Sequence, residues 1–425
     1  MKSNLSPDQQ EALNKFIDFI LKDESNEFVI AGSAGTGKTF LTKYLLEKGF
    51  EALSTYRELF DKNLPHYEVH LTSTTNQAAS ILAANSGFDA KTIHSLLKLV
   101  VSNDYQTGEV KLNQKDFDGV YESIIFIDEA SMIDDKLYGY IQYCLLQPEF
   151  KNKVIYIGDE YQLPPVNNKD CIVFNRVPNI VRLTTIQRQA LNNPIISLAN
   201  SFREAVDTGK FPSIIPDDTH ILRLDGSTFK DTINNTFTDP NSMYNSKVLA
   251  WTNKRVNEYN KHIRGLHTSS HSFEPDEIVI TNKPIKNSIF GGNVVIKTDR
   301  PVNIKSITPI TFFNLTGSLI KLSPVGEVFI PDKPNEAKKL INQFAKDKVW
   351  VKYFGLKDSI GDLRPVYSCT VHKSQGSTYK NTFIDLHDIG RHYEWKELAK
   401  LLYVAITRAS DRVIFHGSLP KRFGG

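Results

Sequence analysis

The segment Gly32-Ser33-Ala34-Gly35-Thr36-Gly37-Lys38-Thr39 has the most specific chemical signature in the chain. It matches the spacing GxxxxGK[ST], in which glycines allow successive backbone N–H groups to surround phosphate oxygens. Lys38 would reach the β- and γ-phosphates, and the Thr39 hydroxyl would bind Mg²⁺. An apolar segment at 27–31 precedes this loop and an amphipathic segment follows it, so the loop would lie at a helix N-terminus, which favours anions. The sequence therefore predicts a site for the phosphates of ATP.

Two further apolar segments end in polar side chains that would complete this site. Asp128 and Glu129 follow the segment 124–127, and the carboxyl end of a buried parallel strand delivers such residues to the ligand crevice of a sheet. Asp128 would hold Mg²⁺ directly or through water, and Glu129 would be the general base for the attacking water. Gln162, after the segment 154–157, would hydrogen-bond the γ-phosphate or that water. The alternative is that each is a solvated residue of an ordinary turn.

The elements that position these residues are predicted from short apolar segments that alternate with helical patterns. Strands are expected at 27–31, 69–72, 124–127 and 154–157. Such alternation is typical of an α/β fold with a parallel sheet that helices cover on both faces.

The region 285–365 has a different pattern, with β-rich runs separated by glycine and proline. These runs predict a small antiparallel barrel. We include Val349-Trp350-Val351 among its strands, and we expect a helix at 335–346 to interrupt them. The α/β pattern returns from Tyr367.

Composition excludes several classes of protein. The chain has 425 residues, 40% hydrophobic and 23% charged, which excludes a disordered tail, a collagen-like chain and a coiled-coil rod. Its net charge of +3 argues against a wholly basic wrapper of nucleic acid, although a local basic groove is compatible with it. Scattered cysteines without a CxxC pair, the lack of a membrane-length apolar run and a polar start predict a soluble cytoplasmic protein.

Segments along nearly the whole chain resemble, in order, the motifs of superfamily 1 helicases. The segments DEAS at 128–131 and GDEYQLPPV at 158–166 resemble motifs II and III. The others are LSPDQQEA at 5–12 (Q motif), LTSTTNQAA at 71–79 (Ia), TIHS at 92–95 (Ib), LTTIQRQ at 183–189 (IV), TVHKSQGST at 370–378 (V) and LLYVAITRA at 401–409 (VI). The compact size and the TIHS, HKSQG and LLYVAITRA boxes most resemble the RecD/Dda-type branch, superfamily 1B.

This resemblance implies two RecA-like motor domains with parallel sheets. The first is expected at 1–174, with a β-hairpin insert at about 97–118. The second is expected at 175–284 and 366–425, interrupted by the β-rich insert at 285–365, which would be an SH3-like barrel.

The resemblance also implies roles for residues outside the glycine loop. Arg188 and Arg408 would come from the second lobe as arginine fingers and stabilise charge at the γ-phosphate when the lobes close. Gln9 would read adenine, although a helix capping box with Ser6 explains this residue as well. Gly376 in motif V would lie on the nucleotide side.

Closure of the lobes moves a nucleic-acid strand only if both lobes grip it. Hydroxyl, amide and imidazole groups bind phosphate oxygens without reading sequence, and flat rings stack on bases. The candidates are Thr75, His94 and Ser95 in the first lobe, and Asn253, Thr370, His372 and Ser374 in the second. Tyr105 would lie near the hairpin tip and split the duplex, as the pin of Dda-like helicases does, unless this is an ordinary surface hairpin.

The resemblance thus implies an ATP-dependent DNA helicase that moves 5′ to 3′ on single-stranded DNA and unwinds forked DNA, with ATP and Mg²⁺ as cofactors. The alternative is an NTP-dependent RNA helicase or nucleoprotein-remodelling NTPase. A third candidate, a small-molecule phosphotransferase, would have no use for Arg188 or Arg408. We expect a monomer in the cytoplasm of a bacterial or phage-infected cell, with DNA favoured over RNA, replication or recombination proteins as partners and no membrane contact.

Overall fold

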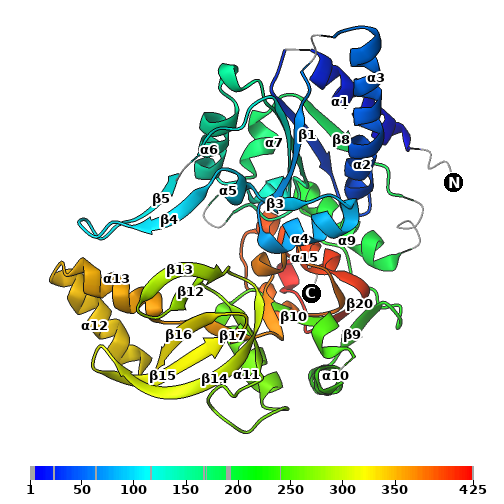
Figure 1. Cartoon of the computed structure of the whole chain (residues 1–425). Coiled ribbons are helices and arrows are strands. Elements are labelled where there is room, and N and C mark those ends of the chain that lie inside the picture. The colour runs from blue at the N-terminus through cyan, green and yellow to red at the C-terminus, as the bar shows by residue number, and fades with distance from the viewer. Residues whose placement is uncertain are drawn as a thin grey trace.

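The computed structural model describes residues 5–22, 24–62, 65–114, 117–165, 168, 170–187, 193–239 and 241–423. Two α/β lobes lie one above the other, and a hairpin from the first lobe projects beside a β-rich insert of the second (Figure 1). Within these described ranges, none of the helices is both long and apolar enough to cross a lipid bilayer.

The first lobe, lobe one, is built on a six-stranded sheet in the order β3-β2-β6-β7-β1-β8, and every strand pair is parallel. Its strands are β1 (Glu27–Gly32), β2 (Glu68–Ser73), β3 (Ala90–Thr92), β6 (Ser123–Asp128), β7 (Lys153–Gly158) and β8 (Ile180–Leu183). Its helices are α1 (Pro7–Leu21), α2 (Lys38–Tyr44), α3 (Phe50–Leu59), α4 (Asn76–Ser86), α5 (Ile93–Leu96), α6 (Asp135–Leu145) and α7 (Ile172–Arg176). The four strands expected from the apolar segments are therefore present.

Alternate residues of the central strands face opposite sides of this sheet, as strand geometry requires. Phe28 and Ile30 of β1 belong to the core cluster formed with α1 and α2, whereas Val29 and Ala31 belong to the cluster formed with α6 and α7. Both faces of β1 are thus covered, which fixes the strand that leads into the glycine loop.

Lobe one extends further along the chain than the sequence predicted. Strand β8 pairs with β1 at Val29↔Ile180 through Gly32↔Leu183 and so completes the sheet of lobe one. The predicted boundary at 174 was therefore too early. The sequence of the short segment 180–183 does not by itself indicate which sheet the segment joins.

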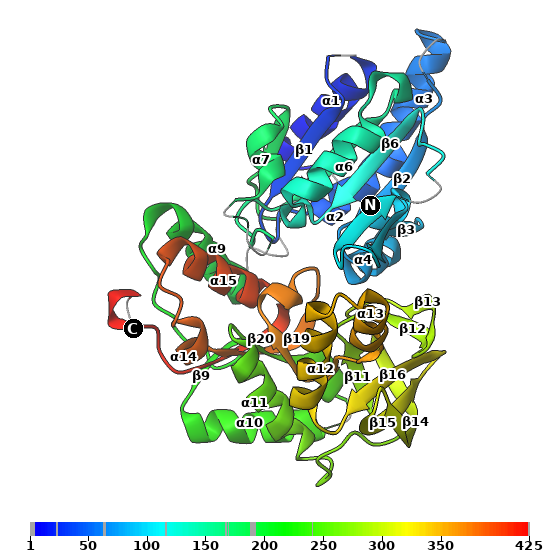
Figure 2. The same cartoon turned by 90° about the vertical axis from the view of Figure 1, so that its left-hand side faces the viewer.

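The second lobe, lobe two, has a five-stranded parallel sheet in the order β18-β10-β19-β20-β9. Its strands are β9 (Ile221–Leu224), β10 (Ser246–Ala250), β18 (Ser368–Thr370), β19 (Tyr379–Asp385) and β20 (Ala409–His416). Its helices are α9 (Pro194–Thr208), α10 (Gly226–Thr238), α11 (Asn253–Arg264), α14 (Leu386–Ile389) and α15 (Trp395–Thr407). Helices α9 and α15 lie on the side of lobe two that faces lobe one (Figure 2).

The insert of lobe two contains an antiparallel five-stranded sheet, β16-β15-β14-β11-β17, and a separate pair, β12-β13. The strands are β11 (Ile278–Thr281), β12 (Ile285–Ser288), β13 (Gly291–Ile296), β14 (Pro301–Phe312), β15 (Leu315–Leu322), β16 (Gly326–Pro331) and β17 (Leu363–Pro365). The expected helix is present as α12 (Pro334–Lys346). Since β11 pairs with β14 and β17, this sheet begins before residue 285, where we had predicted the insert to start.

The prediction of a strand at Val349–Val351 was wrong, because Trp350–Ser359 forms a helix, α13. Phe354 is buried in this helix, whereas Val351 is 69% exposed. Trp350 and Phe354 are four residues apart, so the aromatic side chains follow helical spacing and outweigh the β preference of a three-residue run.

The hairpin of lobe one consists of β4 (Leu99–Asn103) and β5 (Val110–Gln114), paired antiparallel. Its turn reaches α13 of the insert, where the Tyr105 ring lies edge-on against Phe354 with centroids 5.4 Å apart. Asn103 Nδ2 donates a hydrogen bond to Asp358 Oδ2 at 2.7 Å. A Cβ on Gly108 would lie 2.3 Å from the Trp350 ring, so glycine permits this close approach. The hairpin and the insert are therefore in direct contact.

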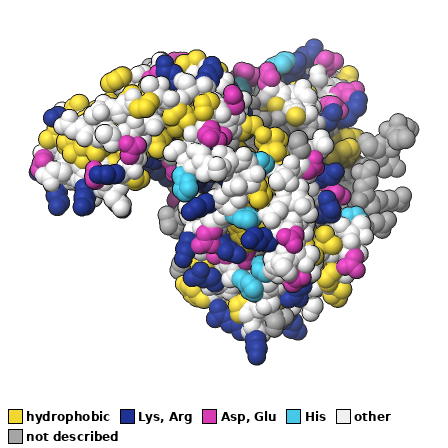
Figure 3. All heavy atoms as spheres, turned by 90° about the horizontal axis from the view of Figure 1, so that it is seen from below, with side chains coloured by type: hydrophobic (Ala, Val, Ile, Leu, Met, Phe, Trp, Pro, Cys, Tyr) yellow, Lys and Arg dark blue, Asp and Glu magenta, His cyan; other side chains and the backbone are white. Residues whose placement is uncertain are grey.

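The face of the molecule seen from below carries charged side chains of both signs. Lys and Arg side chains are interspersed there with Asp and Glu (Figure 3). This distribution agrees with the net charge of +3.

Candidate active site between the two lobes

The glycine loop joins β1 to α2 at the carboxyl edge of the lobe-one sheet. Gly35 and Gly37 have φ angles of 82° and 78°, in the left-handed region that favours glycine. A Cβ on Gly37 would lie 2.7 Å from Gln9 Nε2, so this position is also restricted by a close contact. The loop conformation thus depends on the glycines that define the motif.

Lys38 begins α2, and its ammonium lies within the loop. Its Nζ donates hydrogen bonds to the Gly32 carbonyl at 2.6 Å and the Ser33 carbonyl at 3.2 Å. An anionic phosphate is a stronger acceptor than these neutral carbonyls. Lys38 is therefore held at the position from which it would bind the phosphates of ATP.

Asp128 ends β6 beside Glu129, as the sequence predicted. Burial and the charge of Glu129 together raise the pKa of Asp128 to about 7, although the hydrogen bond from the Glu129 N–H and the charge of Lys38 lower it. Asp128 Oδ1 accepts a hydrogen bond from the Glu129 backbone N–H at 2.9 Å. Thr39, next to Lys38 on α2, is exposed. A carboxylate and a hydroxyl are oxygen donors that suit Mg²⁺, and a divalent cation would offset the cost of ionising Asp128 beside Glu129.

Gln162 follows β7 and is 7% exposed. Its Oε1 is buried and has no hydrogen-bond partner in the described part of the chain. A buried polar atom without a partner is uncommon in proteins and calls for a ligand or water. This atom therefore fits the predicted contact of Gln162 with a phosphate or the attacking water.

Gln9 makes the capping-box contact and also reaches the glycine loop. Its Oε1 accepts a hydrogen bond from the Ser6 N–H at 3.1 Å, which is the capping-box contact at the start of α1. Its Nε2 donates to the Thr36 carbonyl at 3.1 Å, so the same side chain reaches the glycine loop. Gln9 thus lies beside the nucleotide site while it caps the helix.

The two predicted arginine fingers have different outcomes. Arg188 lies outside the described residues. Arg408 ends α15 and is buried, and its guanidinium donates to the Val404 and Ser377 carbonyls, both at 3.2 Å, and to Thr407 Oγ1 at 3.1 Å. These hydrogen bonds are thus within lobe two rather than with the glycine loop, so the role of Arg408 as a finger stays a prediction.

Two other side chains of lobe two do reach the glycine loop, and the sequence did not single them out. The Ala34 N–H donates a hydrogen bond to the Tyr403 hydroxyl at 2.9 Å, and Tyr403 in turn donates to the Asp159 carboxylate. Arg203 Nη1 donates to Ser33 Oγ at 3.0 Å. Tyr403 lies inside the LLYVAITRA box, which was a signal for it, whereas Arg203 lies in none of the quoted motifs.

The predicted strand-binding residues of lobe one lie at helix starts. Thr75 caps α4, where its Oγ1 accepts a hydrogen bond from the Ala78 N–H at 3.2 Å. His94 and Ser95 lie in the short helix α5. Burial lowers the pKa of His94, which favours the neutral imidazole.

On lobe two, Asn253 and Thr370 line one small pocket of about 50 Å³, together with Lys373 and with Gln77 of lobe one. The pocket therefore has walls from both lobes. Burial also lowers the pKa of His372, two residues after Thr370 in the same motif.

Two predicted residues of motif V lie elsewhere than expected. The Ser374 hydroxyl is fully buried and donates to the Val371 carbonyl at 2.7 Å, so it is not presented to a strand. A Cβ on Gly376 would lie 3.1 Å from Ala78 Cβ and 3.5 Å from Thr75 Oγ1, which places this glycine against α4 of lobe one. Gly376 is thus next to a predicted strand contact rather than the glycine loop.

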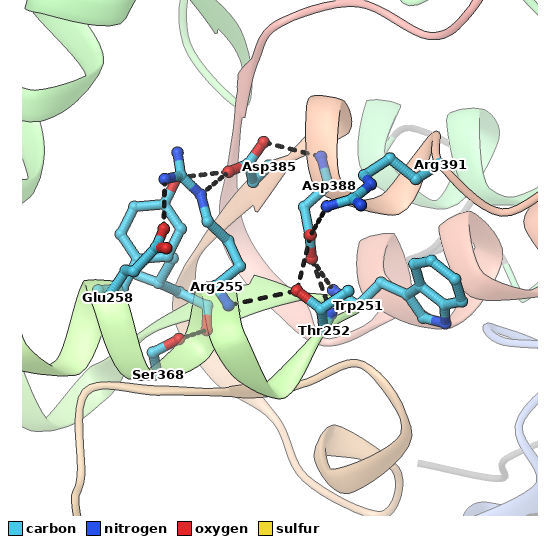
Figure 4. A network of polar contacts seen from close by, with 10 residues as sticks. Trp251, Thr252, Arg255, Glu258, Ser368, Asp385, Asp388 and Arg391 are labelled. Atoms are coloured by element: carbon cyan, nitrogen blue, oxygen red, sulfur yellow. Dashed lines mark hydrogen bonds and ion pairs between the residues drawn. The ribbon is translucent and has the colours of Figure 1, made fainter.

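A polar network holds the start of α11, where Asn253 lies (Figure 4). Asp388 accepts hydrogen bonds from the Trp251 and Thr252 N–H groups at 2.8 and 2.7 Å. Asp385 accepts one from Arg255 Nε at 2.6 Å. These carboxylates of the β19–α14 segment therefore fix the loop that presents Asn253.

Comparisons with known proteins agree with this architecture. A family model of the AAA domain matches residues 4–211, and one of the UvrD-like helicase C-terminal domain matches residues 365–415. The chain is 27% identical to the ATP-dependent DNA helicase dda of Enterobacteria phage T4, over 97% of this chain and 99% of that protein. It is 24% identical to the ATP-dependent RecD2 DNA helicase of Deinococcus radiodurans, over 92% of this chain and 47% of that protein.

Among solved structures, the Pif1 helicase from Bacteroides in complex with ADP-AlF3 and ssDNA aligns with a TM-score of 0.50. The alignment covers 99% of this chain and 94% of that chain at 17% identity, which shows a shared fold. The predicted resemblance is confirmed: along nearly its whole length the chain is similar to superfamily 1B helicases of the Dda and RecD2 kind, and it shares the two-lobed α/β fold of a Pif1 helicase.

Proposed function

We propose that this chain is an ATP-dependent DNA helicase that translocates on single-stranded DNA and unwinds duplex DNA as its two lobes open and close. The observation that carries the proposal is that the glycine loop of lobe one is in direct contact with Tyr403 and Arg203 of lobe two. A change at the phosphates would therefore act on the position of lobe two. The homologous Dda and RecD2 proteins, both named ATP-dependent DNA helicases, support the same activity.

The proposed hydrolysis uses residues from the ends of three neighbouring strands. Lys38 and the amides of the glycine loop would bind the β- and γ-phosphates of ATP. Glu129 would accept a proton from the attacking water, and the free Oε1 of Gln162 would orient that water. Thr39 and Asp128 would hold Mg²⁺, which neutralises phosphate charge when bound.

Charge that develops on the γ-phosphate would be stabilised from lobe two. Arg188 and Arg408 remain the proposed fingers, and Arg408 would first have to release the Ser377 carbonyl. Gln9, which touches Thr36 of the loop, would contact adenine.

The strand would be gripped on both sides of the pocket between the lobes. Thr75, His94 and Ser95 are the proposed contacts of lobe one, and Asn253, Thr370 and His372 are those of lobe two. The pocket lined by Gln77, Asn253 and Thr370 supports this path. A 5′ to 3′ direction, as the family implies, is part of the proposal.

The hairpin would separate the strands of a fork, with Tyr105 near its tip. Its contact with Phe354 of the insert would give the tip a firm support. We also propose that the antiparallel insert is an SH3-like barrel, consistent with the order of its strands.

The test compares ATP hydrolysis with single-stranded DNA, single-stranded RNA and no nucleic acid. We expect stimulation by DNA and little by RNA, and unwinding of a forked duplex that carries a 5′ tail. Stimulation by RNA instead would favour the alternative, an RNA helicase or nucleoprotein-remodelling NTPase. Forks with a single labelled 5′ or 3′ tail decide the direction.

A further inference from the structure

The hydroxyl group of Tyr403, on α15, forms hydrogen bonds with two loops of lobe one. This oxygen accepts a hydrogen bond from the Ala34 N–H at 2.9 Å and donates its own proton to the Asp159 carboxylate. Ala34 follows β1 and Asp159 follows β7, and these two strands are parallel neighbours. The Tyr403 hydroxyl therefore joins the glycine loop to the loop that also carries Gln162.

Both side chains of this contact are buried, and their polar atoms are hydrogen-bonded. Tyr403 is 0% exposed and Asp159 is 1% exposed. The second oxygen of the Asp159 carboxylate, Oδ1, accepts a hydrogen bond from the Tyr161 N–H at 3.0 Å. Burial raises the pKa of Tyr403 well above its ordinary value, so its hydroxyl keeps the proton that it donates. Loss of this hydroxyl would leave one oxygen of the buried Asp159 carboxylate and the Ala34 amide without this partner.

Arg203 of α9 provides a second contact beside the first. Its Nη1 donates to Ser33 Oγ at 3.0 Å, and its guanidinium lies over the Tyr161 ring at 5.5 Å from the centroid. Consecutive residues of the glycine loop, Ser33 and Ala34, are thus held by two helices of lobe two. Tyr403 is the more direct of the two contacts, because it bonds a backbone amide of the loop.

Lys38 gives the contact a link to phosphate binding. The charge of Lys38 acts on Asp159, whose pKa burial raises and Lys38 lowers. The carboxylate that Tyr403 holds is thus in the electrostatic surroundings of the lysine proposed to bind phosphate.

We propose that Tyr403 is a positioning residue that couples lobe two to the phosphate-binding loop by holding the Ala34 amide and the Asp159 carboxylate. This inference rests on the proposed function and deepens it. It means that the effect of strand binding reaches the phosphate-binding loop through a hydroxyl group rather than through an arginine finger.

The test is Tyr403→Phe, which removes only the hydroxyl. We expect the ratio of DNA-stimulated to unstimulated hydrolysis to fall by about tenfold or more, because a hydrogen bond to a charged group is lost. The Kd for single-stranded DNA without nucleotide should stay within about twofold of that of the unaltered chain, since the strand contacts are unchanged.

The matched control is Tyr156→Phe. Tyr156 is also fully buried and donates to a carboxylate, Glu27 Oε1, at 2.8 Å, but it lies in the core of lobe one away from the glycine loop. We expect it to lower the melting temperature and leave the stimulation ratio unchanged. Asp159→Asn keeps the shape of the side chain and should reduce the stimulation ratio as Tyr403→Phe does. If Tyr403→Phe does not fold, Asp159→Asn is the variant that tests the proposal.

The outcomes separate this inference from the proposed function. An unchanged ratio in folded Tyr403→Phe, or equal losses in the stimulated and unstimulated rates, would overturn the coupling role while leaving the helicase proposal in place. If hydrolysis by the unaltered chain is indifferent to DNA, both fail.

Discussion

Lys38 is the residue whose role is most directly testable. Its ammonium is held by the carbonyls of Gly32 and Ser33, and no loop amide can replace its full charge. Lys38→Ala should therefore reduce ATP hydrolysis by about 100-fold or more. Lys43→Ala is the matched control, because Lys43 lies on the same helix but forms only an exposed pair with Glu47 at 3.9 Å. Retained turnover in Lys38→Ala, measured by phosphate release, would exclude the glycine loop as the site.

Arg408 tests whether lobe two supplies a catalytic charge. Arg408→Ala should spare ATP binding and reduce hydrolysis by about 1,000-fold, the usual worth of an arginine finger. Equilibrium binding of a fluorescent ATP analogue and the rate of turnover distinguish these effects. Arg412→Ala is the matched control. Arg412 is also an arginine of lobe two, and its Nε donates a hydrogen bond at 3.0 Å to Asn381 Oδ1 on the neighbouring strand β19. A parallel loss of binding and turnover would mean that Arg408 only supports Ser377 and Val404.

At this scale, sequence spacing predicts which residues lie shortly after a strand. Lys38, Asp128 and Gln162 are close to their expected positions, because short motifs follow directly from their strands. Tyr403 and Arg203 could not be found this way, since their partners are 369 and 170 residues away along the chain. Ser374 shows the opposite error: a motif position that the fold buries.

Among the elements, the hairpin β4-β5 carries the clearest prediction. Tyr105 is 54% exposed yet contacts Phe354, so its ring is supported on one side and free on the other. Tyr105→Ala should reduce the unwinding rate by several-fold, about 1 kcal/mol of lost aromatic contact, while DNA-stimulated hydrolysis stays near normal. A gel or stopped-flow assay measures the unwinding rate, and phosphate release measures the rate of DNA-stimulated hydrolysis. Tyr143→Ala, a 70% exposed tyrosine on α6, is the control. Equal losses in both rates would count against a pin.

The network at the end of β19 predicts a pH effect on stability. Burial raises the pKa of Asp385, but hydrogen bonds from Tyr259 and Arg255 outweigh it, and the pKa lies below the ordinary 3.8. A carboxyl with a lowered folded-state pKa stabilises the fold above its unfolded pKa and loses that effect as pH falls through the folded value. Asp385→Asn should therefore lower the free energy of unfolding by about 1–3 kcal/mol at pH 7. Below about pH 4, the free energies of unfolding of the variant and the unaltered chain should become more similar.

Thermal unfolding of both chains between pH 3 and pH 7 checks this prediction. Asp18→Asn is the matched change at an exposed carboxylate, paired with Lys22 at 3.2 Å, and should have little effect at any pH. A destabilisation by Asp385→Asn that stays constant over this range would mean that Asp385 acts by shape and not by charge.

Element prediction succeeded where the local sequence pattern is distinct and failed where the position of a segment depends on residues outside it. The strands at 27–31 and 124–127 were found because both of their faces are apolar, and α12 because its pattern spans three turns. The run 349–351 was misassigned, since the aromatic spacing that makes α13 extends beyond it. Strand β8 was missed because its place is set by a partner about 150 residues earlier in the chain, β1.

The whole molecule has a nearly neutral charge, which constrains how it holds DNA. Most proposed strand contacts are uncharged, and burial lowers the pKa of His94 and His372, so both imidazoles are neutral at pH 7.5. Each phosphate neutralised on a single strand contributes about −0.7 to the slope of log K against log salt. We expect a slope shallower than about −3, measured by fluorescence anisotropy of a labelled oligothymidine. A slope of about −6 would require a basic groove that these contacts lack.

The contact between the hairpin and α13 constrains how the lobes can move. Lobe one meets lobe two at the glycine loop, and Tyr105 of its hairpin meets Phe354 of the insert. The hairpin β4-β5 and α13 lie well to one side of the molecule (Figure 1). The lobes also touch between these contacts, at Gly376, which lies against α4 of lobe one. Simple separation of the lobes must therefore break the outlying contact of the hairpin as well as the contacts near the glycine loop. A rotation of lobe two that keeps the hairpin against α13 would break fewer of them. We expect that removal of the hairpin would change the relative motion of the lobes as well as the fate of the duplex.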